Sequence, residues 1–231
     1  MDKTGWLTWR IAKRGKRPLR VTVGMASLAG DGYVSGDSVC YGEVGRETFA
    51  VVLSDGMGNG HRAAEESGLI VRTVYQLLSA NYPPELALPI TNAVMLYRSA
   101  GGEEFYSTLD LALINLHSGN LQLYKTGASL TVIRRRKRLG IVRMSSLPMG
   151  VVGDLPVPSW TCHLRSGDQI LLLSDGIAEA GRRENCWLTD AILDQLSSDP
   201  HSVAENLIRR AAERAGETEK DDMTAVVIVV Q

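Results

Sequence analysis

The chain has 231 residues, of which 44% are hydrophobic and 22% charged, and 25 Lys and Arg nearly balance 26 Asp and Glu, so that the net charge is −1. This length suits one large domain with a sizeable core, and the balanced charge gives no reason to expect nucleic acid or an anionic membrane as a partner. Three scattered cysteines argue against a disulfide framework, and no apolar run reaches the ~18 residues of a membrane span. We therefore expect a cytoplasmic domain that makes no membrane contact itself, while leaving open that it comes from a larger membrane protein.

The first residues differ in pattern from the rest of the chain. Residues 1–20 combine tryptophans with several basic side chains, which is typical of a regulatory amphipathic helix or an arm. The main domain is predicted to span residues 21–231. It opens with a strand at 21–25, where β-branched residues dominate.

A hairpin and two helices are predicted next. Strands at 38–43 and 48–54 turn at Gly45-Arg46, and the second strand is so continuously apolar that we expect it at the centre of a sheet. Apolar and small residues then keep helical spacing over 63–78. A second helix is predicted over 90–97, with Pro89 in its opening turn and with Ile90, Ala93, Val94 and Tyr97 on its apolar face.

The second half of the chain is predicted to consist mainly of short strands. They cover 109–116, 121–126, 130–136, 141–144, 160–164, 169–174 and 223–230, and helices are predicted at 189–196 and 202–215. Short turns between consecutive strands favour antiparallel hairpins over parallel crossovers. We therefore predict an α+β fold, an α-β-β-α sandwich of two antiparallel sheets flanked by helix pairs.

Three aspartate-bearing runs share one design. Asp55 and Asp175 each follow Leu-Ser at the end of an apolar strand, and Asp221-Asp222 directly precedes the last strand. A carboxylate at such a position is costly unless it is paired or binds a metal, and the runs themselves contain no Lys or Arg. Glycine after the first two aspartates would let the backbone turn sharply. Because Asp-Gly is also a common turn, the pattern alone is only suggestive of a hard cation.

In order and spacing, these runs resemble the signature of metal-dependent PPM-type serine/threonine phosphatases. The matching runs are Ser-Asp-Gly-Met-Gly-Asn-Gly at 54–60, Ser-Asp-Gly at 174–176 and Asp-Asp-Met-Thr at 221–224, with support at 35–38, 106–111 and 147–150. The resemblance is strongest to the phosphatase domains of the stage II sporulation protein E family. It covers about residues 23–230.

The resemblance implies a two-metal site. Asp55 would bridge the two ions, and the carbonyl of Gly56 would bind the second. Asp175 and one residue of the Asp221-Asp222 pair would hold the first ion. Asp221 is the first choice, because in the family the ligand is the Asp that precedes an Asn, and Asp222 stands in the place of that Asn.

Further residues and the chemistry follow from the same resemblance. Asp37 matches an acidic position near the metals and is a catalytic candidate together with Asp55. The phosphate-binding Arg that the family often supplies has no clear match, and Arg20 is only a guess. Two Mn²⁺ or Mg²⁺ ions are implied, which would activate water for attack on phosphorus and which suit oxygen ligands.

The resemblance also implies a biological role. The chain is expected to be a protein serine/threonine phosphatase that acts on phosphoserine in a phosphorylated anti-sigma-factor antagonist, so activating a sporulation sigma factor. It implies that the parent protein is anchored in the cell membrane by a region absent here. Whether the chain forms a homodimer is left open. The segment before residue 21 and the two helices at 63–78 and 90–97 are hypothesised to switch activity by moving the metal loop.

Two alternatives compete with this interpretation. A catalytically silent binding module of the same fold is one, although retention of the aspartates disfavours it. Cys40 and Arg46 have the six-residue spacing of a cysteine phosphatase loop, but they lie in a predicted hairpin, not at a helix N-terminus. The basic run 134–138 could bind an acidic partner, yet a solvated hairpin tip is the simpler interpretation.

Overall fold

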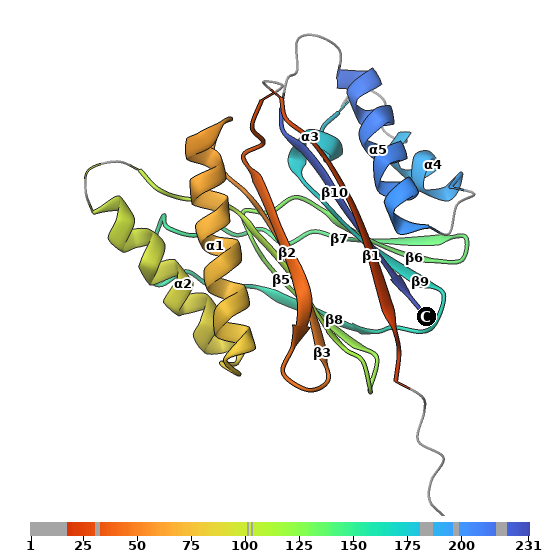
Figure 1. Cartoon of the computed structure of the whole chain (residues 1–231), viewed down its shortest axis with the longest axis horizontal. Coiled ribbons are helices and arrows are strands. Elements are labelled where there is room, and N and C mark those ends of the chain that lie inside the picture. Colours follow the sequence, from red (N-terminus) through yellow and green to blue (C-terminus); the bar gives the residue numbers. More distant parts are fainter. Residues whose placement is uncertain are drawn as a thin grey trace, which may run out of the picture.

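The computed structural model describes residues 18–30, 33–100, 102, 104–180, 187–195, 199–215 and 221–231. It forms two antiparallel sheets packed face to face with helices on the outer faces (Figure 1), which confirms the predicted α-β-β-α sandwich. Most of the N-terminal segment predicted as a helix or arm lies outside the described residues. No helix within the described ranges is both long enough and apolar enough to cross a membrane.

Sheet B carries the hairpin that leads into the first aspartate run. Its strand order is β2-β3-β4-β5-β8, and the strands span Asp37–Val44 (β2), Thr48–Asp55 (β3), Leu109–Asn115 (β4), Asn120–Thr126 (β5) and Ser159–His163 (β8). The turn between β2 and β3 contains Gly45, whose φ of 68° requires a residue without a Cβ penalty. Strand β3 is central, as its continuous apolar run predicts.

The last strand of the chain lies inside sheet A, with a neighbouring strand on each side. Its order is β1-β10-β9-β6-β7, with strands Val21–Leu28 (β1), Met223–Val230 (β10), Asp168–Leu173 (β9), Thr131–Arg135 (β6) and Arg138–Val142 (β7). Every residue of β10 is buried. Its alternate residues face different layers, since Val227 packs under the helices and Ile228 packs between the sheets.

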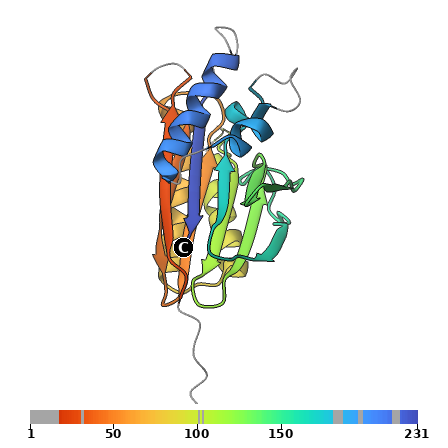
Figure 2. The ribbon, with the colours of Figure 1, turned by 90° about the vertical axis from the view of Figure 1, so that its right-hand side faces the viewer.

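Helices cover both outer faces. Helices α1 (His61–Ser79) and α2 (Pro84–Ser99) pack on sheet B, and α3 (Asp175–Ala178), α4 (Trp187–Leu193) and α5 (Pro200–Ala215) lie on the side of sheet A. Figure 2 shows α5 lying along the long strands β1 and β10. Three apolar layers result, one between the sheets and one under each helical cover.

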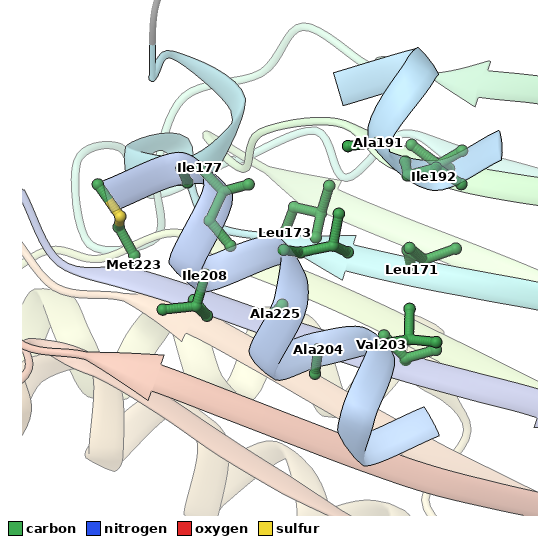
Figure 3. Packing of buried hydrophobic residues seen from close by; sticks show 14 of the residues in the cluster. Leu171, Leu173, Ile177, Ala191, Ile192, Val203, Ala204, Ile208, Met223 and Ala225 are labelled. Carbon is green, nitrogen blue, oxygen red and sulfur yellow. The ribbon is translucent and has the colours of Figure 1, made fainter. Parts of the chain in front are cut away.

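The layer under α5 shows how small and large side chains interlock. Ala204 and Ile208 on α5 lie over Ala225 of β10, and Leu171 and Leu173 of β9 fill the space toward α4 (Figure 3). Burial of such side chains contributes roughly 1.5–3 kcal/mol each. This layer therefore fixes the position of the β9 and β10 ends that carry aspartates.

The second helix differs from the prediction. It begins at Pro84, not near Ile90, because Pro83 is extended and a proline fits the first turn of a helix. Pro89 therefore lies inside the helix. It is tolerated because Glu85, whose carbonyl loses its bond, is exposed to water.

The buried face of α2 was also predicted wrongly. Ile90 and Tyr97 are exposed, and the residues turned to the core are Ala87, Leu88, Thr91, Asn92 and Met95. The buried polar side chains of α2 have hydrogen-bond partners. Thr91 donates a hydrogen bond to the Ala87 carbonyl, and the Asn92 amide donates to the carbonyls of Val152 and Gly153.

Two smaller differences concern strand and helix ends. The strand predicted at 141–144 is β7 and spans Arg138–Val142. It starts earlier than predicted because the basic run 134–138 itself forms the hairpin, which turns at Arg136 with a φ of 56°. The hairpin-tip interpretation of that run is thereby confirmed. The short helix α3 was not predicted, because four residues are too few to show a helical period.

Candidate metal centre

The predicted aspartates gather at one end of the sandwich, between the two sheets. Asp37 begins β2 and is the register partner of Asp55, which ends β3. Asp175 opens α3 directly after β9, and Asp221 and Asp222 immediately precede β10. A hydrogen bond of 3.0 Å from the Ser174 amide to the Thr224 carbonyl joins the ends of β9 and β10. The fold thus brings together residues that are up to 185 positions apart (37 to 222).

The electrostatics of this cluster are those of carboxylates without a matching cation. Burial raises the pKa of Asp55 to about 10, and the charges of Asp37, Asp175 and Asp221 add to the rise. Burial also raises the pKa of Asp37 to about 6; the hydroxyls of Thr224 and Ser174 oppose the rise, and Asp222 and Asp175 add to it. Among the described residues, none of the five aspartates forms an ion pair with Lys or Arg.

Asp221 and Asp222 have different surroundings. The Asp222 carboxylate is only 2% exposed and accepts hydrogen bonds from the backbone amides of Gly30 (2.8 Å) and Gly36 (2.6 Å). Asp221 is exposed, and one of its oxygens accepts a bond from the Asp222 amide. Partial burial, followed by the charge of Asp175, raises the pKa of Asp221 although the residue reaches solvent. Asp222 therefore ties the loop before β2 to β10, whereas Asp221 lies near enough to Asp55 and Asp175 for their charges to interact.

The backbone around Asp55 is held by the start of β4. The Asp55 amide donates to the Thr108 hydroxyl (2.9 Å), and the Ser107 hydroxyl donates to the Asp55 carbonyl (2.5 Å). Ser54 donates to the Thr108 carbonyl (2.5 Å), and its hydroxyl lies 2.8 Å from that of Ser107. This clamp gives the sequence run 106–111 a physical role.

The glycines after Asp55 and Asp175 are required for close packing, not for a positive φ. A Cβ on Gly56 would lie 2.1 Å from the carbonyl oxygen of Ala63 in α1. A Cβ on Gly176 would lie 2.3 Å from the carbonyl oxygen of Asp222. Neither residue has a positive φ, so the need for glycine at these two positions comes from the neighbouring backbone and not from a left-handed conformation.

The residues present fit a hard cation. Both carboxylate oxygens of Asp37 are buried, and the nearby hydroxyls of Thr224 and Ser174 form no hydrogen bond of normal geometry with them in the described residues; so weakly partnered a buried carboxylate is costly without a cation. Within the same residues, no three His, Cys, Asp or Glu side chains already converge on one metal position. The donors are oxygens only, which suits Mg²⁺ or Mn²⁺ better than Zn²⁺.

The competing candidates do not join this cluster. Arg20 pairs with Gln231 at the far end of β1, about 25 Å of strand from Leu28, which pairs with Met223 next to the aspartates. The guess that Arg20 binds phosphate is therefore wrong. Cys40 lies within β2, and burial raises the pKa of its thiol, which disfavours a thiolate nucleophile. His61 is exposed at the start of α1.

One buried residue beside the metal loop was missed in the sequence. Glu66 of α1 is 2% exposed, forms an ion pair with Arg62 at 3.2 Å and accepts a backbone hydrogen bond from Met57. It therefore couples α1 to the loop that follows Asp55. Its position three residues after Ala63 and four before Ile70, on the apolar face of the predicted helix, was the signal for it.

The comparisons with known proteins point to one family. The family model "Stage II sporulation protein E (SpoIIE)" matches residues 45–231. The stage II sporulation proteins E of Bacillus subtilis (strain 168) and Priestia megaterium are each 32% identical to the chain, over 94% and 91% of its length. The chain spans only 27% and 36% of those two proteins.

Solved structures show the same relationship. The PP2C phosphatase domain with a regulatory-domain fragment of SpoIIE from Bacillus subtilis has a TM-score of 0.84 at 31% identity, covering 93% of this chain and 64% of that one. RsbX in complex with magnesium shares the fold, with a TM-score of 0.69 at 16% identity over 94% of this chain and 97% of that one. The chain belongs to the stage II sporulation protein E family and has its PP2C-type phosphatase fold.

Proposed function

We propose that the chain is a metal-dependent protein phosphatase that hydrolyses phosphoserine or phosphothreonine. The observation that carries the proposal is the group of aspartates from both sheets, which lacks a pairing Lys or Arg in the described residues and which includes buried, unpartnered oxygens on Asp37. Membership of a phosphatase family supports it. The cluster is costly without cations and becomes favourable with them.

Each residue has a proposed role. Asp55 would bridge two Mn²⁺ or Mg²⁺ ions, Gly56 would offer its carbonyl to one, and Asp175 and Asp221 would hold the other. Asp37 would orient and deprotonate water beside Asp55. We assign Asp222 a positioning role, because its carboxylate already accepts two backbone amides. When bound, the two ions would supply an activated water and neutralise charge developing on the phosphoryl oxygens.

The substrate and setting are proposed from the family. The substrate would be a phosphorylated anti-sigma-factor antagonist, and its dephosphorylation would activate a sporulation sigma factor. The chain would act as a cytoplasmic domain of a membrane-anchored parent, alone or as a homodimer. The curated relatives are about two and a half to three and a half times as long as the chain, which leaves room for such an anchor.

Control of the site is proposed to run through α1. Gly56 touches the backbone of Ala63, and Glu66 accepts the Met57 amide, so a shift of α1 must move the loop after Asp55. The Arg98–Glu65 ion pair links α1 to α2 on the surface. Substitutions across the α1–α2 contact should change Mn²⁺ affinity and hydrolysis together; unchanged values for both would refute this control.

The first experiment is hydrolysis of a phosphoserine protein with Mn²⁺, with EDTA, and by the Asp55→Ala, Cys40→Ser and Asp190→Asn variants. We expect activity that needs Mn²⁺, is lost in Asp55→Ala and survives in the other two variants. Asp190 is a matched control because it is an exposed aspartate on α4. Activity that persists in EDTA but is lost in Cys40→Ser would refute the metal mechanism.

The substrate is tested separately with a phosphorylated anti-sigma-factor antagonist and an unrelated phosphoserine protein. A clear preference in kcat/KM for the first would support the proposed substrate. Equal rates would leave the phosphatase proposal intact but overturn the substrate. Binding of the phosphorylated antagonist without any hydrolysis in Mn²⁺ would favour a catalytically silent binding module.

A further inference from the structure

The two sheets leave an open edge between β7 and β8. Strand β7 ends sheet A and β8 ends sheet B, and no strand in the described residues pairs with the outer side of either. Residues from both strands line one groove of about 400 Å³, where Val142 and Met144 belong to the same apolar layer as Cys162. In Figure 1 the β6–β7 hairpin lies on the opposite side of the molecule from α1 and α2.

The groove exposes part of the layer between the sheets. Its floor includes Ile133 and Val142, which belong to the buried cluster between the sheets. Its rim carries Ile141, which is 53% exposed, and Trp160, which is 37% exposed. A patch of exposed apolar side chains next to unpaired strand edges is typical of a docking surface for an extended segment.

The charge around the groove has one sign. Its lining includes Arg135, Arg138 and Arg143 but no Asp or Glu. Arg135 is partly neutralised by Asp168 at 3.1 Å, whereas Arg138 and Arg143 form no ion pair within the described parts of the chain. Arg136 and Lys137 at the hairpin tip are exposed and add to the field.

The charge decides between occupants. The chain's own residues 1–17 contain six Lys and Arg and a single Asp, so the arginines would repel them. A second copy that paired β7 with β7 would bring two equally basic edges together, and the antiparallel register that sets Arg138 opposite Arg143 would be destabilised by like charges. Charged side chains also protect edge strands against unwanted pairing, yet that protection fails for a strand of opposite charge.

We infer that the groove between β7 and β8 binds an extended, acidic segment of a partner protein, which would pair with the edge of β7 and place apolar side chains against Val142 and Trp160, on the side of the layer between the sheets. Acidic side chains on the opposite face of such a segment would lie on the side of Arg143, and an acidic residue at its end would meet Arg138. Backbone bonds to the strand edge would give affinity, and the alternation of apolar and acidic residues would give selectivity. The inference does not depend on the chemistry at the aspartates.

The test measures binding of a fluorescein-labelled peptide of four Val-Asp repeats to the whole chain by fluorescence anisotropy. The comparison peptides carry Lys in place of Asp, or proline at alternate positions so that backbone pairing is blocked. The groove variant is Arg138→Glu with Arg143→Glu. The control variant is Arg46→Glu with Arg209→Glu, which makes the same charge change at exposed sites away from the groove.

We expect saturable binding of the Val-Asp peptide that the groove variant weakens roughly tenfold and the control variant weakens much less. The Lys and proline peptides should bind weakly, and bound Val-Asp peptide should slow amide exchange at 138–142. Absence of binding up to about 1 mM, or equal loss in both variants, would overturn the inference. Binding of RNA or phosphatidylserine vesicles at Arg138 and Arg143 without peptide binding would also overturn it, as would a dimer that Ile141→Glu dissociates. Thermal unfolding of each variant verifies that it is folded.

Discussion

Asp221 and Asp222 show how far the surroundings of a residue determine its role. The two side chains are chemically identical and adjacent, but one is exposed beside the carboxylate cluster and the other is buried under two backbone amides. Hydrogen bonds to a charged carboxylate contribute about 1.5–3 kcal/mol, whereas an exposed carboxylate near like charges contributes none. Asp221 therefore contributes little to the stability of the fold and is available to bind a cation.

This difference predicts opposite effects of substitution. Asp221→Asn should abolish detectable Mn²⁺ binding and activity while the free energy of unfolding without metal stays the same or rises. Asp222→Ala should lower that free energy by about 1–3 kcal/mol, because the amides of Gly30 and Gly36 lose their acceptor. Calorimetric titration with Mn²⁺ and urea unfolding in EDTA measure the two quantities. Loss of Mn²⁺ binding in a stable Asp222→Asn variant, with Asp221→Asn unaffected, would reverse the assignment.

The raised pKa of Asp37 predicts a pH dependence. Its pKa rises from 3.8 to about 6 on folding, so the folded state binds more protons than the unfolded state between these values. In EDTA, the free energy of unfolding should therefore fall as the pH rises from 3.8 to about 6, and Asp55, with a pKa of about 10, should continue the fall at higher pH.

Urea unfolding at a series of pH values measures this trend. Asp37→Asn should make the fall shallower between pH 3.8 and about 6, where Asp55 still contributes, and Asp190→Asn should leave the trend unchanged. Added Mn²⁺ should oppose the trend, since metal binding requires deprotonated ligands. A stability that rises with pH in EDTA would contradict the prediction.

Sequence reasoning at this scale found every aspartate of the cluster but not their partners. Asp55, Asp175 and the Asp221-Asp222 pair are visible because each adjoins a buried strand, whereas Asp37 entered only through the family resemblance. The amides that hold Asp222 come from Gly30 and Gly36, and only the β1–β10 and β2–β3 pairings bring them near. The choice between Asp221 and Asp222 depends on such contacts, and Arg20 was misplaced for the same reason.

At the scale of elements, the start of β4 fixes the end of β3. Thr108 and Ser107 bond to the amide and the carbonyl of Asp55, so the position of the Asp55 carboxylate depends on the β3–β4 register. Ser107 and Thr108 belong to the run 106–111, which supported the family resemblance but to which the sequence analysis assigned no structural role. A hydroxyl pair at a strand start thus acts as a clamp on a site carried by the neighbouring strand.

The clamp predicts a graded effect at position 108. Thr108→Val should leave the Asp55 amide without an acceptor and lower the free energy of unfolding by about 1–3 kcal/mol. It should also weaken Mn²⁺ binding, because Asp55 loses its fixed backbone. Thr108→Ser keeps the hydroxyl and should retain most of both properties. Urea unfolding and calorimetric titration measure them, and equal behaviour of the Val and Ser variants would show that the hydroxyl has no such role.

The helices show where periodicity succeeds and fails. The α1 pattern predicted its bounds to within two residues, because five of the eight residues on its buried side are apolar and keep helical spacing. The buried side of α2 includes Thr91 and Asn92, so an apolar pattern selected the exposed Ile90 and Tyr97 instead. Burial of Asn92 is offset by three hydrogen bonds: its side chain accepts one from the Gly150 amide and donates two to backbone carbonyls. These partners lie in a loop 58 or more residues away in the sequence.

At the scale of the whole molecule, one polar group joins the two sheets beneath the metal centre. Asp110 of β4 and Lys125 of β5 form a fully buried ion pair in sheet B, and both bond to the hydroxyl of Thr131 in sheet A. Asp110 also lines the small cavity that contains Asp55 and Asp175. The network therefore fixes how the sheet bearing Asp55 sits on the sheet bearing Asp175.

Breaking this pair should destabilise the fold and loosen the site together. Lys125→Met should lower the free energy of unfolding by about 3–5 kcal/mol, since it leaves Asp110 buried without its cation. Adding Asp110→Leu to that variant should recover much of the stability, because no buried charge then remains unpaired. Mn²⁺ affinity should stay low in the double variant if the network aligns the sheets, and should return with stability if the pair serves the fold alone. Urea unfolding and calorimetric titration of the single and double variants distinguish these outcomes. A Lys125→Met variant as stable as the unaltered chain would show that Asp110 has another partner or is protonated.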